Sequence, residues 1–175
     1  MTGVQTCALP IFSPPSIQAI ALDVDSVGAE ARLVGFVSER RPRPIVARLD
    51  NGIWKSMPEP FRDSGYISSL DQTPSGETWI VGTRLVDRAI PVARRRTDGT
   101  PWAKLDYPPL GAGGVFTDVV ALHDGRAVAV GYIQSRDRQA GVIVRWDGDR
   151  ATVETIGGRI EPVASPTSGG PSDRK

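Results

Sequence analysis

Arginine side chains gather at three places in the sequence, each between two apolar stretches. Guanidinium groups bind carboxylate, sulfate and phosphate groups through paired hydrogen bonds, so three such clusters on one surface would form a basic rim for an acidic ligand. Aspartates in the same segments, Asp87 and Asp137, reduce the positive charge, and charged hairpin tips also serve simply to stay solvated. We favour this solvation interpretation and keep the rim as the candidate site. The arginines are Arg40, Arg41 and Arg43, then Arg84 and Arg88, then Arg136 and Arg138.

The other reactive side chains form no recognisable catalytic or metal-binding pattern. His123 is the only histidine and lies beside Asp124 with no serine or cysteine partner in view, so a solvated turn residue is a better interpretation than a general base. Asp23 and Asp25 have the spacing of a calcium loop, but the glycine and glutamate that complete such a loop do not follow. The sequence offers no cysteine–histidine cluster for zinc and no glycine-rich loop that opens a helix. We therefore predict no catalytic residue, no metal and no cofactor.

The segments that carry the arginines belong to an internal repeat. Each copy reads as a Val-Gly pair, a polar tip, a second apolar run and a turn that ends in glycine, with 17 residues from the first glycine to the last. The first glycines are Gly35, Gly82 and Gly131, so successive copies are 47 and 49 residues apart. A fixed period of this length is typical of a β-propeller or another repeat array. The copies are Val34–Gly52, Val81–Gly99 and Val130–Gly148.

Each repeat predicts four short strands. Runs of five to eight residues rich in Val, Ile and Trp alternate with turn residues, and no window has a helical period. The sequence therefore predicts an all-β fold, a partial β-propeller of about three four-stranded antiparallel blades. The blades are expected at about residues 17–58, 66–107 and 116–156, and a stub of a fourth blade at 160–170. A disordered tail rich in Pro, Ser and Gly is the alternative for that last segment.

This pattern resembles bacterial propeller repeats of the kelch and Asp-box kind over nearly all of residues 17–156. The Trp146-Asp147 pair is similar to a WD40 repeat, but no Gly-His pair opens any blade. The stretch 75–79 resembles the end of a sialidase Asp box, yet Gln72 and Pro74 stand where that motif has Ser and Asp. The resemblance therefore implies an architecture and not a sialidase activity. It also favours an extracytoplasmic location, in the secreted fraction or at the cell surface.

A propeller places particular residues at defined positions. Val34, Val81 and Val130 are expected to face the cores between blades, since a blade cannot bury both faces alone. Trp54, Trp102 and Trp146 are expected between the sheets near the turns. Asp118 and Asp63 are expected near the central channel, where propeller enzymes often carry carboxylates. The tips with Arg40, Arg41, Arg88, Arg136 and Arg138 are expected on one face, together with the connections between blades.

Both ends of the chain resemble translated sequencing-library adapter. Residues 1–11, MTGVQTCALPI, are similar to the in-frame translation of a common adapter, and Asp173, Arg174 and Lys175 match its reverse strand. A secretion signal is the poorer interpretation of the first segment, because it has no basic start and too short an apolar core. We expect 1–12 to be an adapter-derived artefact with its junction, 173–175 to be a second artefact, and 13–172 to be a propeller fragment of a larger bacterial protein.

Composition narrows the possible partners. The 175 residues carry 21 Lys+Arg against 20 Asp+Glu, so a net charge of +1 gives no overall attraction to nucleic acid or acidic lipid. No apolar run is long enough to span a bilayer. We predict a non-catalytic module that binds a protein or an acidic glycan on the hairpin-tip face. A fragment of a propeller-bearing glycan hydrolase and a structural repeat of a surface protein are the alternatives.

Overall fold

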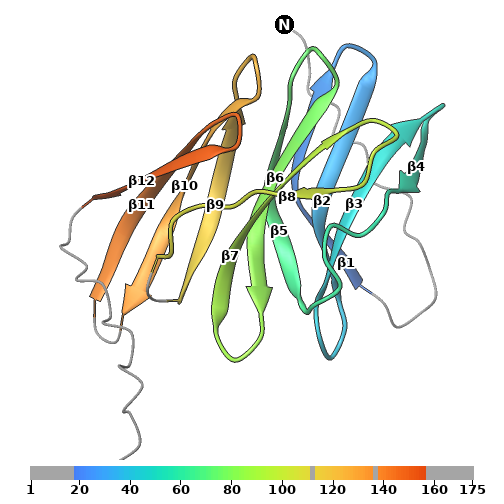
Figure 1. Cartoon of the computed structure of the whole chain (residues 1–175). Coiled ribbons are helices and arrows are strands. Elements are labelled where there is room, and N and C mark those ends of the chain that lie inside the picture. Colours follow the sequence, from blue (N-terminus) through green and yellow to red (C-terminus); the bar gives the residue numbers. More distant parts are fainter. Residues whose placement is uncertain (1–17, 111–112, 136–137, 157–175) are drawn as a thin grey trace, which may run out of the picture.

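The computed structural model describes residues 18–110, 113–135 and 138–156, which form three four-stranded antiparallel sheets and no helix (Figure 1). This confirms the predicted all-β fold, a partial propeller-like array of about three blades. Sheet 1 contains β1 (Gln18–Val27), β2 (Glu30–Ser38), β3 (Arg43–Asp50) and β4 (Ile53–Ser56). Sheet 2 contains β5 (Gly65–Gln72), β6 (Glu77–Leu85), β7 (Ala89–Thr97) and β8 (Ala103–Lys104). Sheet 3 contains β9 (Gly113–Ala121), β10 (Arg126–Ser135), β11 (Arg138–Asp147) and β12 (Arg150–Ile156).

Within each sheet the strands pair in chain order, so every sheet is a simple meander. The tight turns follow the predicted chemistry. Asn51 and Gly52, between β3 and β4, have φ angles of 50° and 78°, which suit an Asn-Gly hairpin turn. The three sheets lie side by side, with the β2–β3 and β6–β7 hairpin tips at the lower end in Figure 1. The predicted fourth-blade stub at 160–170 and the expected artefact segments 1–12 and 173–175 lie outside the described residues.

The first strand of each sheet, which we call the inner strand, explains why glycine recurs in the Val-Gly pair. This inner strand carries a β-bulge at Leu22, Ser68 or Thr117, each of which is skipped in the pairing with the second strand. Just before the bulge, the inner strand passes so close to the glycine that a side chain there would collide with backbone. A Cβ on Gly82 would lie 2.8 Å from Cα of Ile67 and nearer still to the carbonyl oxygen of Tyr66. Only glycine fits this close approach.

Two apolar cores hold the three sheets together. Strand β5 contacts β1, β2 and β3, and β9 contacts β5, β6 and β7, so each inner strand packs on the sheet before it. The core between sheets 1 and 2 includes Val34, Val46, Phe61, Ile67, Leu70, Ile80 and Val92. The core between sheets 2 and 3 includes Trp79, Val81, Ala93, Phe116, Val119, Ala129, Val142, Val144 and Trp146.

The predicted core positions are buried only where a following sheet covers them. Val34 and Val81 are fully buried, as predicted, but Val130 is 39% exposed. The prediction for Val130 is wrong because no sheet packs on that face of sheet 3 within the described residues. Trp146 is buried between sheets 2 and 3, Trp102 packs partly against the first core, and Trp54 is half-buried at the edge of sheet 1.

No helix in the described part of the chain is long and apolar enough to cross a membrane.

Candidate functional site

The aspartate side chains of the inner strands form hydrogen bonds with the neighbouring sheets. Asp23, Ser69 and Asp118 occupy the same position in β1, β5 and β9, directly after the bulge. The Ser69 hydroxyl lies 2.9 Å from Asp23 Oδ2 and 2.7 Å from Asp118 Oδ1, so it links all three sheets. Asp23 Oδ2 also accepts the Leu70 backbone N–H at 3.0 Å. These contacts give Asp23 and Asp118 a role in holding inner strands together.

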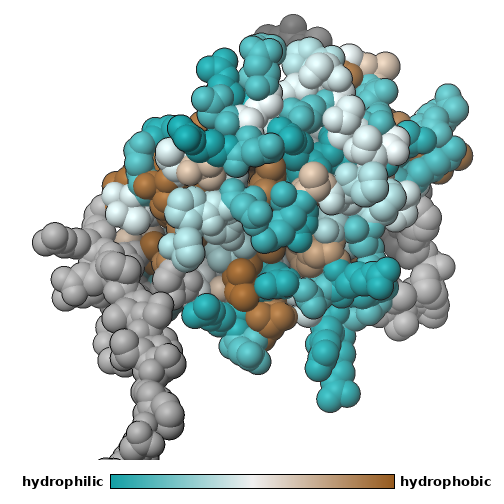
Figure 2. All heavy atoms as spheres, viewed as in Figure 1, coloured by the Kyte–Doolittle hydropathy of each residue, from teal (hydrophilic) through white to brown (hydrophobic). Residues whose placement is uncertain are grey.

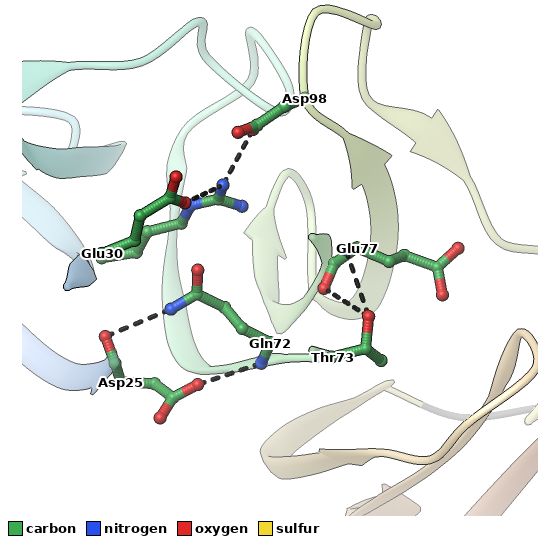
Figure 3. Close-up of polar contacts among 7 residues, drawn as sticks. Asp25, Glu30, Gln72, Thr73, Glu77 and Asp98 are labelled. Atoms are coloured by element: carbon green, nitrogen blue, oxygen red, sulfur yellow. Dashed lines mark hydrogen bonds and ion pairs between the residues drawn. The ribbon is translucent and has the colours of Figure 1, made fainter. Parts of the chain in front are cut away.

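A second carboxylate position repeats the same device. Asp25 accepts the Gln72 backbone N–H at 3.0 Å across the boundary between sheets 1 and 2 (Figure 3). Asp71 accepts the Ala121 N–H at 2.6 Å across the boundary between sheets 2 and 3. The Gln72 side chain returns a bond to the Asp25 carbonyl oxygen at 3.2 Å. Burial raises the pKa of Asp71, and the negative charge of Asp25 acts in the same direction, whereas the two backbone N–H bonds from Ala121 and Gln72 oppose the rise.

An ion pair closes the boundary between sheets 1 and 2 at the end opposite the tips. Arg32 of β2 is 1% exposed, and its guanidinium lies 2.8 Å from Asp98 in the β7–β8 turn and 3.5 Å from Glu30 (Figure 3). A buried arginine is tolerated only with such partners. At the next boundary Arg95 of β7 lies 3.6 Å from Asp149, in the β11–β12 turn. In sheets 1 and 2, therefore, one arginine side chain forms an ion pair with the last turn of the following sheet.

A groove opens on the tip face between sheets 1 and 2. It has a volume of about 660 Å³ and is lined by three segments, the β2–β3 hairpin, the β4–β5 connection and the β6–β7 hairpin. Hydrophilic side chains project from this lower end of the molecule in Figure 2. The lining residues are Glu39, Arg41 and Arg43, then Arg62, Asp63 and Ser64, then Leu85, Val86 and Asp87.

Backbone hydrogen bonds fix the walls of the groove. Pro42 O accepts the Gly65 N–H at 2.8 Å and the Ser64 hydroxyl at 3.1 Å, which ties the connection to the first hairpin. Ser64 O accepts the Leu85 N–H at 2.7 Å, which ties it to the second. The three walls are thus connected before any ligand arrives, and a preorganised site loses less conformational entropy on binding.

The charges of the groove are partly neutralised by ion pairs. Arg43 lies 3.0 Å from Glu39 and 3.2 Å from Glu59, and the hydrogen bond to Glu39 raises the pKa of Arg43. Asp63 is paired with Arg84 at 3.1 Å. Arg41 and Arg62 form no ion pair within the residues that the structure describes. These two exposed guanidinium groups are the cations left to meet an acidic ligand.

The structure brings some of the predicted arginines together and separates others. Arg41 and Arg43 line the groove, whereas Arg40 is exposed on the same hairpin outside the lining. Arg88 lies at the β6–β7 tip, beside Gly113 of sheet 3. Arg136 and Asp137 lie outside the described residues, and of Arg138 only the backbone at the start of β11 is described.

Of the two aspartates expected near the channel and the single histidine, one aspartate lies at the groove and the other two residues lie elsewhere. Asp118 lies on the inner strand β9 and is no part of the groove lining, while Asp63 lies in the β4–β5 connection at the groove. His123 is an exposed turn residue between β9 and β10, whose carbonyl oxygen accepts a bond from Arg126. In the described ranges, no cluster of three or more His, Cys, Asp or Glu side chains could hold a metal ion.

Sequence reasoning missed three functional positions. Ser69 and Asp71 act between sheets, and Arg62 completes the groove from an irregular connection. The first two had a signal in the sequence. Asp23, Ser69 and Asp118 precede the glycine of their Val-Gly pairs by 12, 13 and 13 residues, and Asp25 and Asp71 precede theirs by 10 and 11. Arg62 had none, since it belongs to no repeated pattern.

No protein-family model matches this sequence, and no curated protein matches it significantly.

Proposed function

We propose that this chain is a non-catalytic binding module of propeller repeats that captures an acidic ligand in the tip-face groove. The observation that carries the proposal is the pair Arg41 and Arg62, two exposed guanidinium groups that line one groove from two different segments, the β2–β3 hairpin and the β4–β5 connection. Guanidinium groups bind carboxylate and sulfate groups in a fixed geometry.

A protein segment suits the groove better than a uniform polyanion does. Glu39, Asp63 and Asp87 line it together with the arginines, so a ligand with negative charge along its whole length would meet repulsion. Leu85 and Val86 add a short apolar wall. An acidic residue next to an apolar one would satisfy both kinds of wall, which favours a peptide or protein partner over an acidic glycan.

The inner-strand carboxylates support a binding role over acid–base catalysis. A glycan hydrolase needs two carboxyl groups facing the scissile bond. Asp23, Asp25 and Asp71 instead accept backbone N–H groups from a neighbouring sheet, and Asp118 contacts Ser69. These bonds occupy carboxylates that an acid–base mechanism would need to leave open to a substrate.

The test compares how two groove variants and one control variant, each lacking one positive charge on the same face, bind to an acidic column. We expect Arg41→Ala to lower the salt concentration at which the protein elutes from an immobilised peptide of alternating Glu and Leu, and Arg62→Ala to do the same. Arg40→Ala serves as the matched control, because Arg40 is exposed on the same hairpin outside the groove. Equal shifts for all three variants would show attraction by net charge alone and would contradict the groove. A parallel column of sulfated dextran separates the two ligand classes, since stronger retention there would favour the glycan.

A further inference from the structure

The charged residues that line the tip-face groove differ in whether another side chain already neutralises them. Glu39 accepts hydrogen bonds from Arg43 at 3.0 and 3.3 Å through its two carboxylate oxygens, so this pair is satisfied within the hairpin. Asp63 is paired with Arg84 at 3.1 Å. Within the described part of the chain, the lining charges that form no ion pair are Arg41, Arg62 and Asp87.

These remaining charges of opposite sign belong to different segments. Arg41 lies in the β2–β3 hairpin and Arg62 in the β4–β5 connection. The two segments are joined at Pro42, whose carbonyl oxygen accepts the Gly65 N–H at 2.8 Å. Asp87 lies in the β6–β7 hairpin. A ligand therefore meets unneutralised positive charge from two connected segments and unneutralised negative charge from the third.

The β6–β7 hairpin adds an apolar surface next to its carboxylate. Val86 is 51% exposed and lines the groove together with Leu85. In this described hairpin, the neighbouring Arg88 forms no ion pair with Asp87. The Cβ and Cδ atoms of Arg88 would lie 3.9 and 4.0 Å from a Cβ on Gly113, so its side chain runs beside sheet 3. The hairpin thus offers the groove both an apolar side chain and a carboxylate.

We propose that the groove recognises a protein segment in which an acidic, an apolar and a basic residue follow one another. This inference rests on the proposed binding function and specifies the ligand of the same groove. The acidic side chain binds Arg41 and Arg62, the apolar side chain packs on Val86, and the basic side chain binds Asp87. The groove volume of about 660 Å³ lies in the range of sites that hold drug-sized ligands, and a tripeptide has that size.

The unpaired charges select against other segments as well as for this one. A ligand with a second acidic residue in place of the basic one places a negative charge at Asp87. A ligand with two basic residues places a positive charge at Arg41 and Arg62. Such like-charge contacts lower affinity, which is how an interface rejects a wrong partner. Because all three side chains are exposed, each contact is modest and selectivity requires both ends of the segment.

The experiment measures the binding of short fluorescent peptides to the full chain by fluorescence anisotropy. The peptides have blocked ends and contain Glu-Leu-Lys, Glu-Leu-Glu or Glu-Ser-Lys between glycines. We expect the protein to bind Glu-Leu-Lys about fivefold more tightly than Glu-Leu-Glu, because one exposed contact changes from attraction to repulsion. Serine in the centre should weaken binding about threefold, since less apolar surface is buried. Val86→Ser should remove that second difference.

Charge-reversal variants locate the contact with the basic residue. Asp87→Lys should reverse the preference, so that Glu-Leu-Glu binds about fivefold more tightly than Glu-Leu-Lys. Asp149→Lys is the matched control, because Asp149 is 97% exposed in the β11–β12 turn, at the end opposite the tips. It should leave the ratio of the two affinities unchanged. Arg41→Ala should weaken both peptides by the same factor, because both carry the glutamate.

The outcomes separate this inference from the proposed function on which it rests. Equal affinity for Glu-Leu-Lys and Glu-Leu-Glu, with Arg41→Ala weakening both, would keep the groove as a binding site and overturn the acidic–apolar–basic ligand. Equal shifts of the ratio in Asp87→Lys and Asp149→Lys would reveal an effect of net charge and would overturn it too. Peptide binding that Arg41→Ala leaves unchanged, or no binding of any peptide, would contradict the proposed function itself.

Discussion

Asp23 of sheet 1 accepts the backbone N–H of Leu70 in sheet 2 at 3.0 Å, across the boundary between the two sheets. The inner strands β1 and β5 belong to different sheets, so no ladder of backbone hydrogen bonds joins them. A side-chain carboxylate therefore takes the place of a paired strand. The same replacement occurs with Asp25 and Gln72 and with Asp71 and Ala121, which makes it a property of the repeat.

Asp23→Ala should destabilise the protein by about 1–3 kcal/mol, because it leaves the Leu70 N–H at the sheet boundary without its acceptor. Asp87→Ala provides the control. Asp87 is exposed at a hairpin tip, and a surface change of this kind shifts the free energy of unfolding by no more than about 0.5 kcal/mol. Urea unfolding followed by circular dichroism measures both. Equal effects would mean that the carboxylate bridge adds nothing to stability.

Gly82→Ala should be among the most damaging single substitutions in the chain. The new Cβ would meet the backbone of Tyr66 and Ile67, which cannot move without breaking the β5–β6 pairing. We expect a loss of about 3 kcal/mol or more, at the upper end for overpacking. Gly99→Ala is the comparison, since its φ is +81° and nothing lies within 4 Å of a Cβ there. That variant should lose only about 1–2 kcal/mol from backbone strain. Thermal unfolding in which Gly99→Ala proved the less stable variant would contradict the close-approach explanation.

Trp146→Ala should cost about 3–5 kcal/mol of unfolding free energy. The indole is 2% exposed, packs on Trp79, Tyr107 and Phe116 at ring separations of 6.2–6.3 Å, and donates to Asp106 O at 3.0 Å. The same change at the half-buried Trp54 should cost less than half as much. Guanidinium denaturation of the two variants beside the wild type checks the ratio. Similar losses would show that the second core does not depend on Trp146.

Alkaline pH should weaken the fold through Tyr107. Burial raises the pKa of this phenol from its usual 10.0 to about 12, and its hydroxyl donates to Pro91 O. The folded pKa lies above the unfolded one, so the stabilisation is complete below pH 10.0 and is lost as pH rises towards 12. Absorbance of the phenolate at 295 nm should show one tyrosine that titrates late. Tyr107→Phe should remove that late step and flatten the fall in unfolding free energy over this range. Persistence of the late step in Tyr107→Phe would assign it to another tyrosine.

The sequence alone predicted the sheets because their signals are local. The Val-Gly pair, the glycine turns and the alternating apolar runs lie within one repeat, and they gave the strand pattern of each sheet. Burial of Val130 could not be predicted this way, since it depends on whether another sheet covers the face. The contact between Asp23 and Ser69 could not be predicted from the sequence either, because the two residues come from different repeats and meet only when the sheets pack together.

The sequence predicted a rim of arginines on the hairpin tips, and the groove itself was not predicted, for a related reason. The arginines of the hairpin tips stand out in the sequence, and Arg41 and Arg43 do line the groove. The ion pairs that neutralise Arg43 and Arg84 involve Glu39, Glu59 and Asp63, two of which come from the connection between sheets. The charges at a hairpin tip can be counted from the sequence. Which of them form ion pairs depends on the path of the β4–β5 connection, which the sequence does not reveal.

Each sheet is a meander of four consecutive strands, and no strand is exchanged between sheets. A gene segment cut within the connections between sheets, such as those between β4 and β5 and between β8 and β9, therefore specifies a complete unit of hydrogen bonding. Unequal recombination between such points would lengthen or shorten the array without leaving a half-paired strand. A change in the number of repeats would thus leave the aspartate bridges of each remaining boundary in place, so the length of the array can change separately from the fold of its units.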